Sequence, residues 1–184
     1  MYHFIVKSLK TSIWILLPLL FISGTKGSQD SYRSNYSEGR YELQVSGALE
    51  QQLCGVVYFE NTLETNNQGI PFATLSLMFI ENESLDQHSM ELLISKQNQS
   101  NPIKKGKYGV AEKIEGLLND FDGVFGFANL GSIGEEPFFA KQGKVVITKI
   151  TELGLKGYLD ITLNCNKGTR IFINGSFSAT RERG

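Results

Sequence analysis

The chain has 184 residues, with 18 lysines and arginines against 19 aspartates and glutamates. This length suits one domain with a sizeable hydrophobic core. The even charge balance argues against a nucleic-acid-binding protein, which needs a basic stripe to displace counterions from the phosphate backbone.

Residues 1–27 have the three-part layout of a secretory signal peptide. Lys7 and Lys10 precede an apolar run over residues 13–22, and small residues follow it. This layout predicts cleavage near Gly27-Ser28. The apolar run is shorter than the roughly 20 residues of a transmembrane helix, and no cysteine lies near the cleavage point to carry a lipid. We therefore expect a secreted, periplasmic or cell-envelope protein without a transmembrane or lipid anchor.

The mature chain is expected to begin with a disordered lead-in and to continue as a single β domain. Residues 28–39 are polar and show no periodicity, which is typical of disorder. Over residues 40–180, short apolar-rich runs predict strands: most alternate apolar and polar residues and suit half-buried strands, whereas residues 53–59 are apolar on both faces and suit a strand covered on both sides. These runs cover residues 40–47, 53–59, 71–80, 88–95, 121–131, 143–150, 157–165 and 169–179.

The best-specified element is a hairpin over residues 157–179. Its odd-numbered residues are mostly apolar on both arms, so they share one face. A loop of residues 166–168, with Gly168 in the left-handed conformation, pairs Cys165 with Thr169. The resulting register pairs Leu163 with Ile171, Ile161 with Ile173, and Leu159 with Gly175. Turn chemistry and periodicity therefore agree on this hairpin.

Three other segments carry weaker signals. Residues 60–69 and 96–105 are polar and predict loops, and the basic cluster at residues 104–107 is expected to be solvated. Apolar residues at helical spacing predict one short amphipathic helix near residues 111–119. The phenylalanines that follow share one parity, so they are expected to enter the core from a strand: Phe121, Phe125 and Phe127.

Eight or nine short strands with at most one short helix predict an all-β fold. We favour an antiparallel β-sandwich, because several strands are apolar on both faces and the chain has few small residues at inward positions. A closed antiparallel barrel is the alternative.

Several strand segments carry a resemblance to a known group of proteins. GKVVITKI, LKGYLDITL and RIFINGSFSA resemble the C-terminal pattern of uncharacterised secreted β-sandwich proteins, a domain of unknown function in Bacteroidetes-type bacteria. GRYELQVSGA is similar to the early strand of that family, and NPIKKGKYGV is similar to its P-x-G-x-Y segment. The resemblance implies secretion and a β fold. It implies no catalytic residue.

Few residues suited to catalysis or metal binding remain in the mature chain. His88 is its only histidine, which excludes a multi-histidine zinc site, and no G-x-S-x-G motif positions a serine. Glu135, Glu136 and Asp160 could serve a hydrolase, although acids of this kind occur in nearly any domain. We expect no catalytic residue, no cofactor and no metal ion, and we keep a hydrolase as the second alternative.

Two cysteines, Cys54 and Cys165, leave two outcomes open. A disulfide between them would close a loop of 111 residues, and the chain-entropy model gives it about 4 to 5 kcal/mol of stabilisation. Otherwise both are free thiols that behave as small hydrophobic residues.

The leading hypothesis is an exported, non-enzymatic protein with a binding or structural role at the cell envelope or outside the cell. Its partner would be a protein or a glycan. A candidate exposed face consists of hairpin residues that point away from the apolar face: Tyr158, Asp160, Arg170, Phe172 and Asn174. The first alternative is a lipocalin-like barrel for a small apolar ligand, with a cavity lined by Phe125, Phe127, Phe138 and Phe139.

Overall fold

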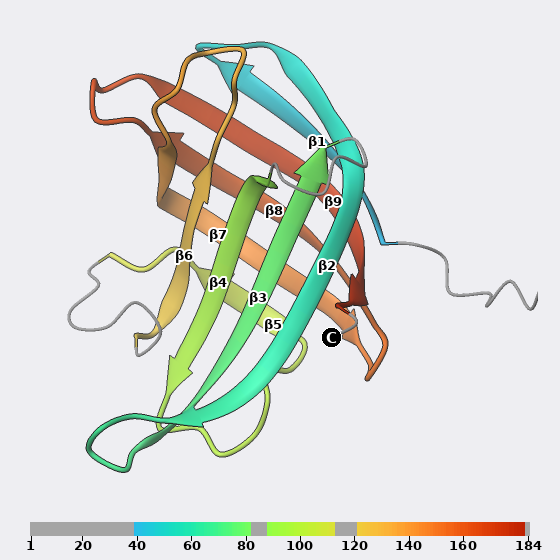
Figure 1. The fold of residues 1–184 in the computed structure, drawn as a ribbon, viewed down its shortest axis with the longest axis vertical. Helices are drawn as coiled ribbons and strands as arrows, with labels where there is room; N and C mark the ends of the chain where they lie inside the picture. Colours follow the sequence, from blue (N-terminus) through green and yellow to red (C-terminus); the bar gives the residue numbers. More distant parts are fainter. Residues whose placement is uncertain (1–38, 82–87, 113–120, 183–184) are drawn as a thin grey trace, which may run out of the picture. The chain divides into compact units, whose positions relative to one another are not determined.

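The computed structural model describes residues 39–81, 88–112 and 121–182. The expected signal peptide, the lead-in up to residue 38 and residues 113–119 of the expected helix lie outside these residues. Among the described residues, no helix is long and apolar enough to cross a membrane. The described residues form nine strands (Figure 1): β1 (Arg40–Gly47), β2 (Gln51–Thr65), β3 (Pro71–Glu81), β4 (His88–Gln97), β5 (Gly106–Gly109), β6 (Gly123–Ala128), β7 (Phe138–Ile150), β8 (Gly154–Asn164) and β9 (Arg170–Arg181).

Eight of these strands form a closed antiparallel barrel. Each strand pairs with the next along the chain, apart from β5, and β9 returns to pair with β1 from Arg40↔Ser178 to Gly47↔Ile171. Figure 1 looks across the barrel, with β2 to β4 in front and β7 to β9 behind. The all-β prediction is confirmed, and the barrel, not the favoured sandwich, is the architecture. A barrel forms because pairing of the first and last strands leaves the main sheet without open edges.

The fifth strand, β5, lies in the barrel wall where β6 and β7 do not pair with each other. β6 and β7 pair directly only at Phe127↔Phe139 and Ala128↔Phe138. Beyond these pairs, β5 pairs with β7, and Val110 next to β5 bridges to Val124 of β6. β5 therefore fills the gap where β6 and β7 diverge.

Large apolar side chains fill the barrel interior. Most of the expected inward positions of β1, β3 and β4 are buried in one core cluster, whereas Gly47, also expected on the inward face, is exposed. The buried ones are Tyr41, Leu43, Val45, Ala73, Leu75, Leu77, Phe79, Met90, Leu92 and Ile94. Three core rings, Tyr41, Phe79 and Phe177, pack edge to face, with centroids 5.2 and 5.7 Å apart. This core leaves the barrel with a packed interior, as is common for eight strands.

The hairpin of β8 and β9 has the predicted register. Leu163 lies opposite Ile171 and Leu159 opposite Gly175. Gly168 has φ 85°, and the amide of Cys165 donates to the carbonyl of Thr169 at 3.0 Å. The left-handed glycine closes the three-residue loop that the sequence predicts.

The prediction that three phenylalanines enter the core is confirmed for Phe121, which is buried just before β6, and wrong for Phe125 and Phe127 of β6. Val124, Gly126 and Ala128 face the core, whereas Phe125 and Phe127 lie on the outer side and are half-buried. Gly126 lies opposite Leu92 of β4, and a Cβ at position 126 would come within 2.3 Å of a Leu92 methyl carbon. The interior has room there only for glycine, so the larger rings take the outer positions.

Candidate binding site

The candidate site begins where β2 extends past its neighbour β9. Phe59 of β2 pairs with Arg181, the last residue of β9. β2 continues from there to Thr65, into residues that the sequence predicts as a loop. The connection between β4 and β5 lies against the exposed edge of β2. The Asn61 amide donates to the carbonyl of Ile103 and accepts from its N–H, both at 3.0 Å.

Ile103 closes this end of the barrel. Its side chain is only 1% exposed and belongs to the core cluster. The paired hydrogen bonds from Asn61 imitate a strand ladder, so they satisfy the backbone of Ile103 without a further strand. The connection over residues 98–105 is therefore fixed to the barrel at its middle.

Further hydrogen bonds hold the rest of this connection. The Gln99 side chain donates to the carbonyls of Asn101 and Pro102, at 2.7 and 3.3 Å. The Tyr108 hydroxyl donates to the carbonyl of Lys104 at 2.7 Å. Burial raises the pKa of Tyr108, and the bond to Lys104 opposes this only in part. The phenol therefore stays a neutral donor near neutral pH, and the loop is preorganised.

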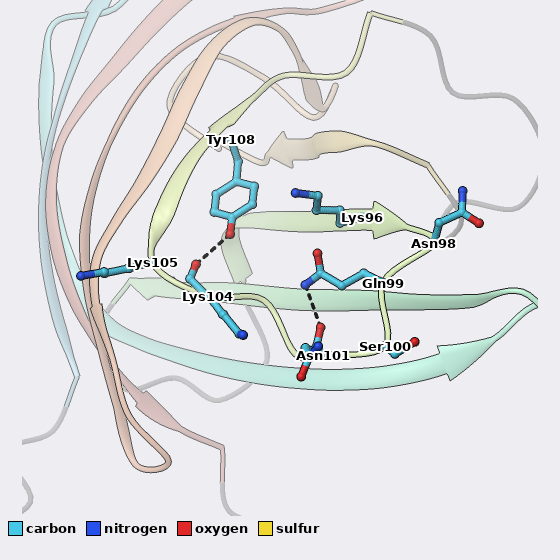
Figure 2. Close-up of a pocket in the computed structure, with 8 residues that line it drawn as sticks. All are labelled: Lys96, Asn98, Gln99, Ser100, Asn101, Lys104, Lys105 and Tyr108. Atoms are coloured by element: carbon cyan, nitrogen blue, oxygen red, sulfur yellow. Dashed lines mark hydrogen bonds between the residues drawn. The ribbon is translucent and has the colours of Figure 1, made fainter.

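A pocket of about 440 Å³ lies between this connection and the end of β4. We call it the loop pocket, and Figure 2 shows its lining residues: Lys96, Asn98, Gln99, Ser100, Asn101, Lys104, Lys105 and Tyr108. In this view the ammonium of Lys105 points away from the other lining residues, and those of Lys96 and Lys104 also lie apart from each other. The volume is within the usual range for small-molecule sites, about 300–1,000 Å³.

All the charged residues that line the loop pocket are positive. Three lysines line it and no aspartate or glutamate does. Within the part of the chain that the structure describes, none of the three lysines forms an ion pair. Unpaired ammonium groups that share one pocket favour an anion, and the neighbouring amide and hydroxyl groups suit a ligand with hydroxyls.

The predicted exposed face lies on the outside of β8 and β9. All five of its residues point outward and are exposed. Asp160 lies opposite Asn174, and the two aromatic residues flank this pair along the strands. Tyr158 is 44% exposed and Phe172 is 42% exposed. The face is therefore open to solvent, and its binding role stays a prediction.

The two cysteines do not form the disulfide, and both are free thiols. The register places Cys54 level with Tyr158 three strands away, and Cys165 lies seven residues further along β8 and just past its end. At about 3.3 Å per residue, the two Cα atoms are more than about 20 Å apart. A disulfide needs Cα atoms within about 7 Å.

Hydrogen bonds at the hairpin tip change the acidity of Cys165. Burial acts to raise the pKa of this thiol, but hydrogen bonds from the Thr169 side chain and from the Lys167 and Thr169 backbone outweigh it. The pKa of Cys165 is therefore lowered. Nearby, Lys167 forms an ion pair with Glu136, with Nζ and Oε1 2.9 Å apart.

Among the described residues, two of the acids considered for a hydrolase lie in different surroundings. Asp160 lies on the exposed face and Glu136 pairs with Lys167, while His88 starts β4 and its side chain lies outside the description. Of the four phenylalanines proposed to line a cavity, only Phe138 joins the core. Among the described residues, no group of three histidines, cysteines, aspartates or glutamates is placed to hold a metal ion.

Sequence reasoning missed the loop pocket. The lysines at 104–107 have the pattern of a solvated loop, and nothing in the sequence joins them to Lys96. One signal was available: Ile103 is a lone aliphatic residue in a polar stretch, and such a residue often fixes a loop to the core. Comparisons with protein-family models, characterised proteins and solved structures find no match to this chain.

Proposed function

We propose that the protein is an exported, non-enzymatic binding protein that holds an acidic saccharide in the loop pocket. The observation that carries this proposal is the set of three lysines around one pocket without a lining carboxylate. A ligand carboxylate or sulfate would face Lys96 and Lys104. Its hydroxyls would meet the amide groups of Asn98 and Asn101 and the hydroxyl of Ser100.

Two features favour ligand binding in the loop pocket over catalysis there and over binding of a ligand inside the barrel. The lining contains no histidine, cysteine or carboxylate that could act as a general base. Large side chains fill the barrel interior, so a ligand would bind in the pocket at the barrel end and not inside the barrel. The fixed connection also reduces the entropy lost on binding. Export rests on the layout of residues 1–27.

Calorimetric titration with trigalacturonate tests the pocket. The acid should bind, its methyl ester should bind much more weakly, and high salt should weaken binding of the acid. Lys96→Gln and Lys104→Gln should each reduce affinity about two- to fivefold, since an exposed charge pair contributes about 0.2–1 kcal/mol. Lys105→Gln should have a smaller effect.

Lys107→Gln is the matched control, because Lys107 is exposed on β5 and does not line the pocket. Its affinity should equal that of the wild type. Equal binding of acid and ester, or equal losses in the Lys104 and Lys107 variants, would contradict the proposal. Sequencing the N-terminus of protein secreted by an expression host tests export, with a start near Ser28 expected. A start at Met1 would count against it.

A second candidate function is docking of a neutral glycan chain on the exposed face. Tyr158 and Phe172 are exposed aromatic residues on the outer face of the antiparallel pair β8 and β9, and such rings stack on apolar faces of sugars. The double variant Tyr158→Ser with Phe172→Ser should lose binding to insoluble neutral polysaccharide. Leu153→Ser removes an equally exposed apolar residue in a turn, and it should bind as the wild type does.

A further inference from the structure

A second pocket of about 350 Å³ lies at the same end of the barrel. We call it the end pocket. It is lined by Phe59 and Asn61 of β2, by the connection at Pro102, Ile103 and Lys104, by Ile150 of β7, by Thr151 and Glu152 of the following turn, and by Arg181. These segments meet there because β9 stops at Arg181, opposite Phe59.

The floor of the end pocket is apolar. Phe59 is 2% exposed and Ile103 is 1% exposed, and Ile150 is half-buried beside them. Two polar side chains in the lining are already engaged. Asn61 binds the backbone of Ile103, and the Thr151 hydroxyl bonds with the backbone of Gly154. The pocket thus offers an apolar surface with few free neutral polar groups.

The rim of the end pocket is charged. Lys104 and Arg181 bring two positive charges and Glu152 brings one negative charge. Among the described residues, none of the three forms an ion pair. The pocket therefore carries one net positive charge next to an apolar floor. A ligand that matches both properties has an apolar body and one anionic group.

We infer that the end pocket binds a small amphipathic carboxylate, such as a medium-chain alkanoate. The alkyl chain lies against Phe59, Ile103 and Ile150, and the carboxylate faces the Arg181 guanidinium, while Lys104 lines both pockets. Arg suits this role because its planar fork can bind a carboxylate through two hydrogen bonds. This ligand differs in class from the acidic saccharide of the loop pocket.

Titration of the full mature chain with octanoate, below its micelle concentration, tests the inference. The methyl signals of Ile103 and Ile150 should shift in methyl NMR spectra, and affinity should rise about fourfold for each buried CH₂ from butyrate to octanoate. Octanol should bind about tenfold more weakly than octanoate, because it lacks the charge. No shift of the two isoleucines, or equal affinity for octanol and octanoate, would overturn the inference.

Arg181→Gln should weaken octanoate binding about five- to tenfold. Arg170→Gln is the matched control, since Arg170 is an exposed arginine at the other end of β9. Equal losses in the two variants would refute the assignment of the carboxylate to Arg181. Arg181 does not line the loop pocket, so Arg181→Gln should bind trigalacturonate normally. That titration distinguishes failure of this inference from failure of the proposed function.

Discussion

Ile103 should contribute more to stability than a residue in a connecting loop usually does. Replacing it with alanine removes three buried carbon atoms, which are worth about 0.8 kcal/mol each. A cavity term adds to this, so Ile103→Ala should lower the free energy of unfolding by about 3 kcal/mol. With an unfolding entropy of about 0.3 kcal/mol/K for roughly 150 residues, Tm should fall by about 10 °C.

Leu153→Ala provides the comparison. It removes the same three carbon atoms from the turn between β7 and β8, where the side chain is 50% exposed. Its free energy of unfolding should change by less than about 0.5 kcal/mol. Urea and thermal unfolding followed by circular dichroism measure both variants. Equal losses for Ile103→Ala and Leu153→Ala would show that Ile103 does not close the barrel end.

Three further predictions concern the core and the thiols. Gly126→Ala should destabilise the fold by about 1–3 kcal/mol through overpacking. Gly131→Ala, whose added Cβ meets no atom within 4 Å, should be nearly neutral. Equal urea midpoints for the two variants would contradict the overpacking at position 126. Alkylation of Cys165 should reach half its maximal rate at a lower pH than alkylation of an unperturbed model thiol does, because the pKa of Cys165 is lowered. Thr169→Val should move that midpoint to higher pH, and an unmoved midpoint would rule out the hydrogen bond as the cause. Thiol titration of denatured, unreduced protein should find Cys54 and Cys165 both free, and one missing pair of thiols would refute the register that separates them.

Local signals in the sequence were enough to predict the hairpin of β8 and β9. Its register depends on alternation over residues 157–179 and on Gly168, all of which lie close together in the chain. The inward face of β6 could not be predicted in this way. It depends on the space beside Leu92 of β4, more than 30 residues earlier in the chain, and the phenylalanines gave the stronger local pattern.

The same limit explains the loop pocket. The exposed face of β8 and β9 follows from strand parity alone, so its residues could be named in advance. The loop pocket requires Lys96 and Lys104 to face one space, and this depends on the bonds between Asn61 and Ile103, 42 residues apart. Nothing in the sequence around Asn61 predicts that its side-chain amide forms hydrogen bonds with the backbone of a residue far along the chain.

The pairing of β1 with β9 has a consequence for how the chain folds. Apart from this pairing and the short parallel pairing of β2 with β9, the eight-stranded wall joins strands that follow one another once β5 is set aside, whereas this one joins Arg40 to Ser178. Such distant pairing slows folding, and until β9 is synthesised the first strand keeps an open edge. A chain cut short before β9 would expose the edges of both β1 and β8. Open edges recruit strands from other molecules, so such a fragment should aggregate and not form a smaller stable domain.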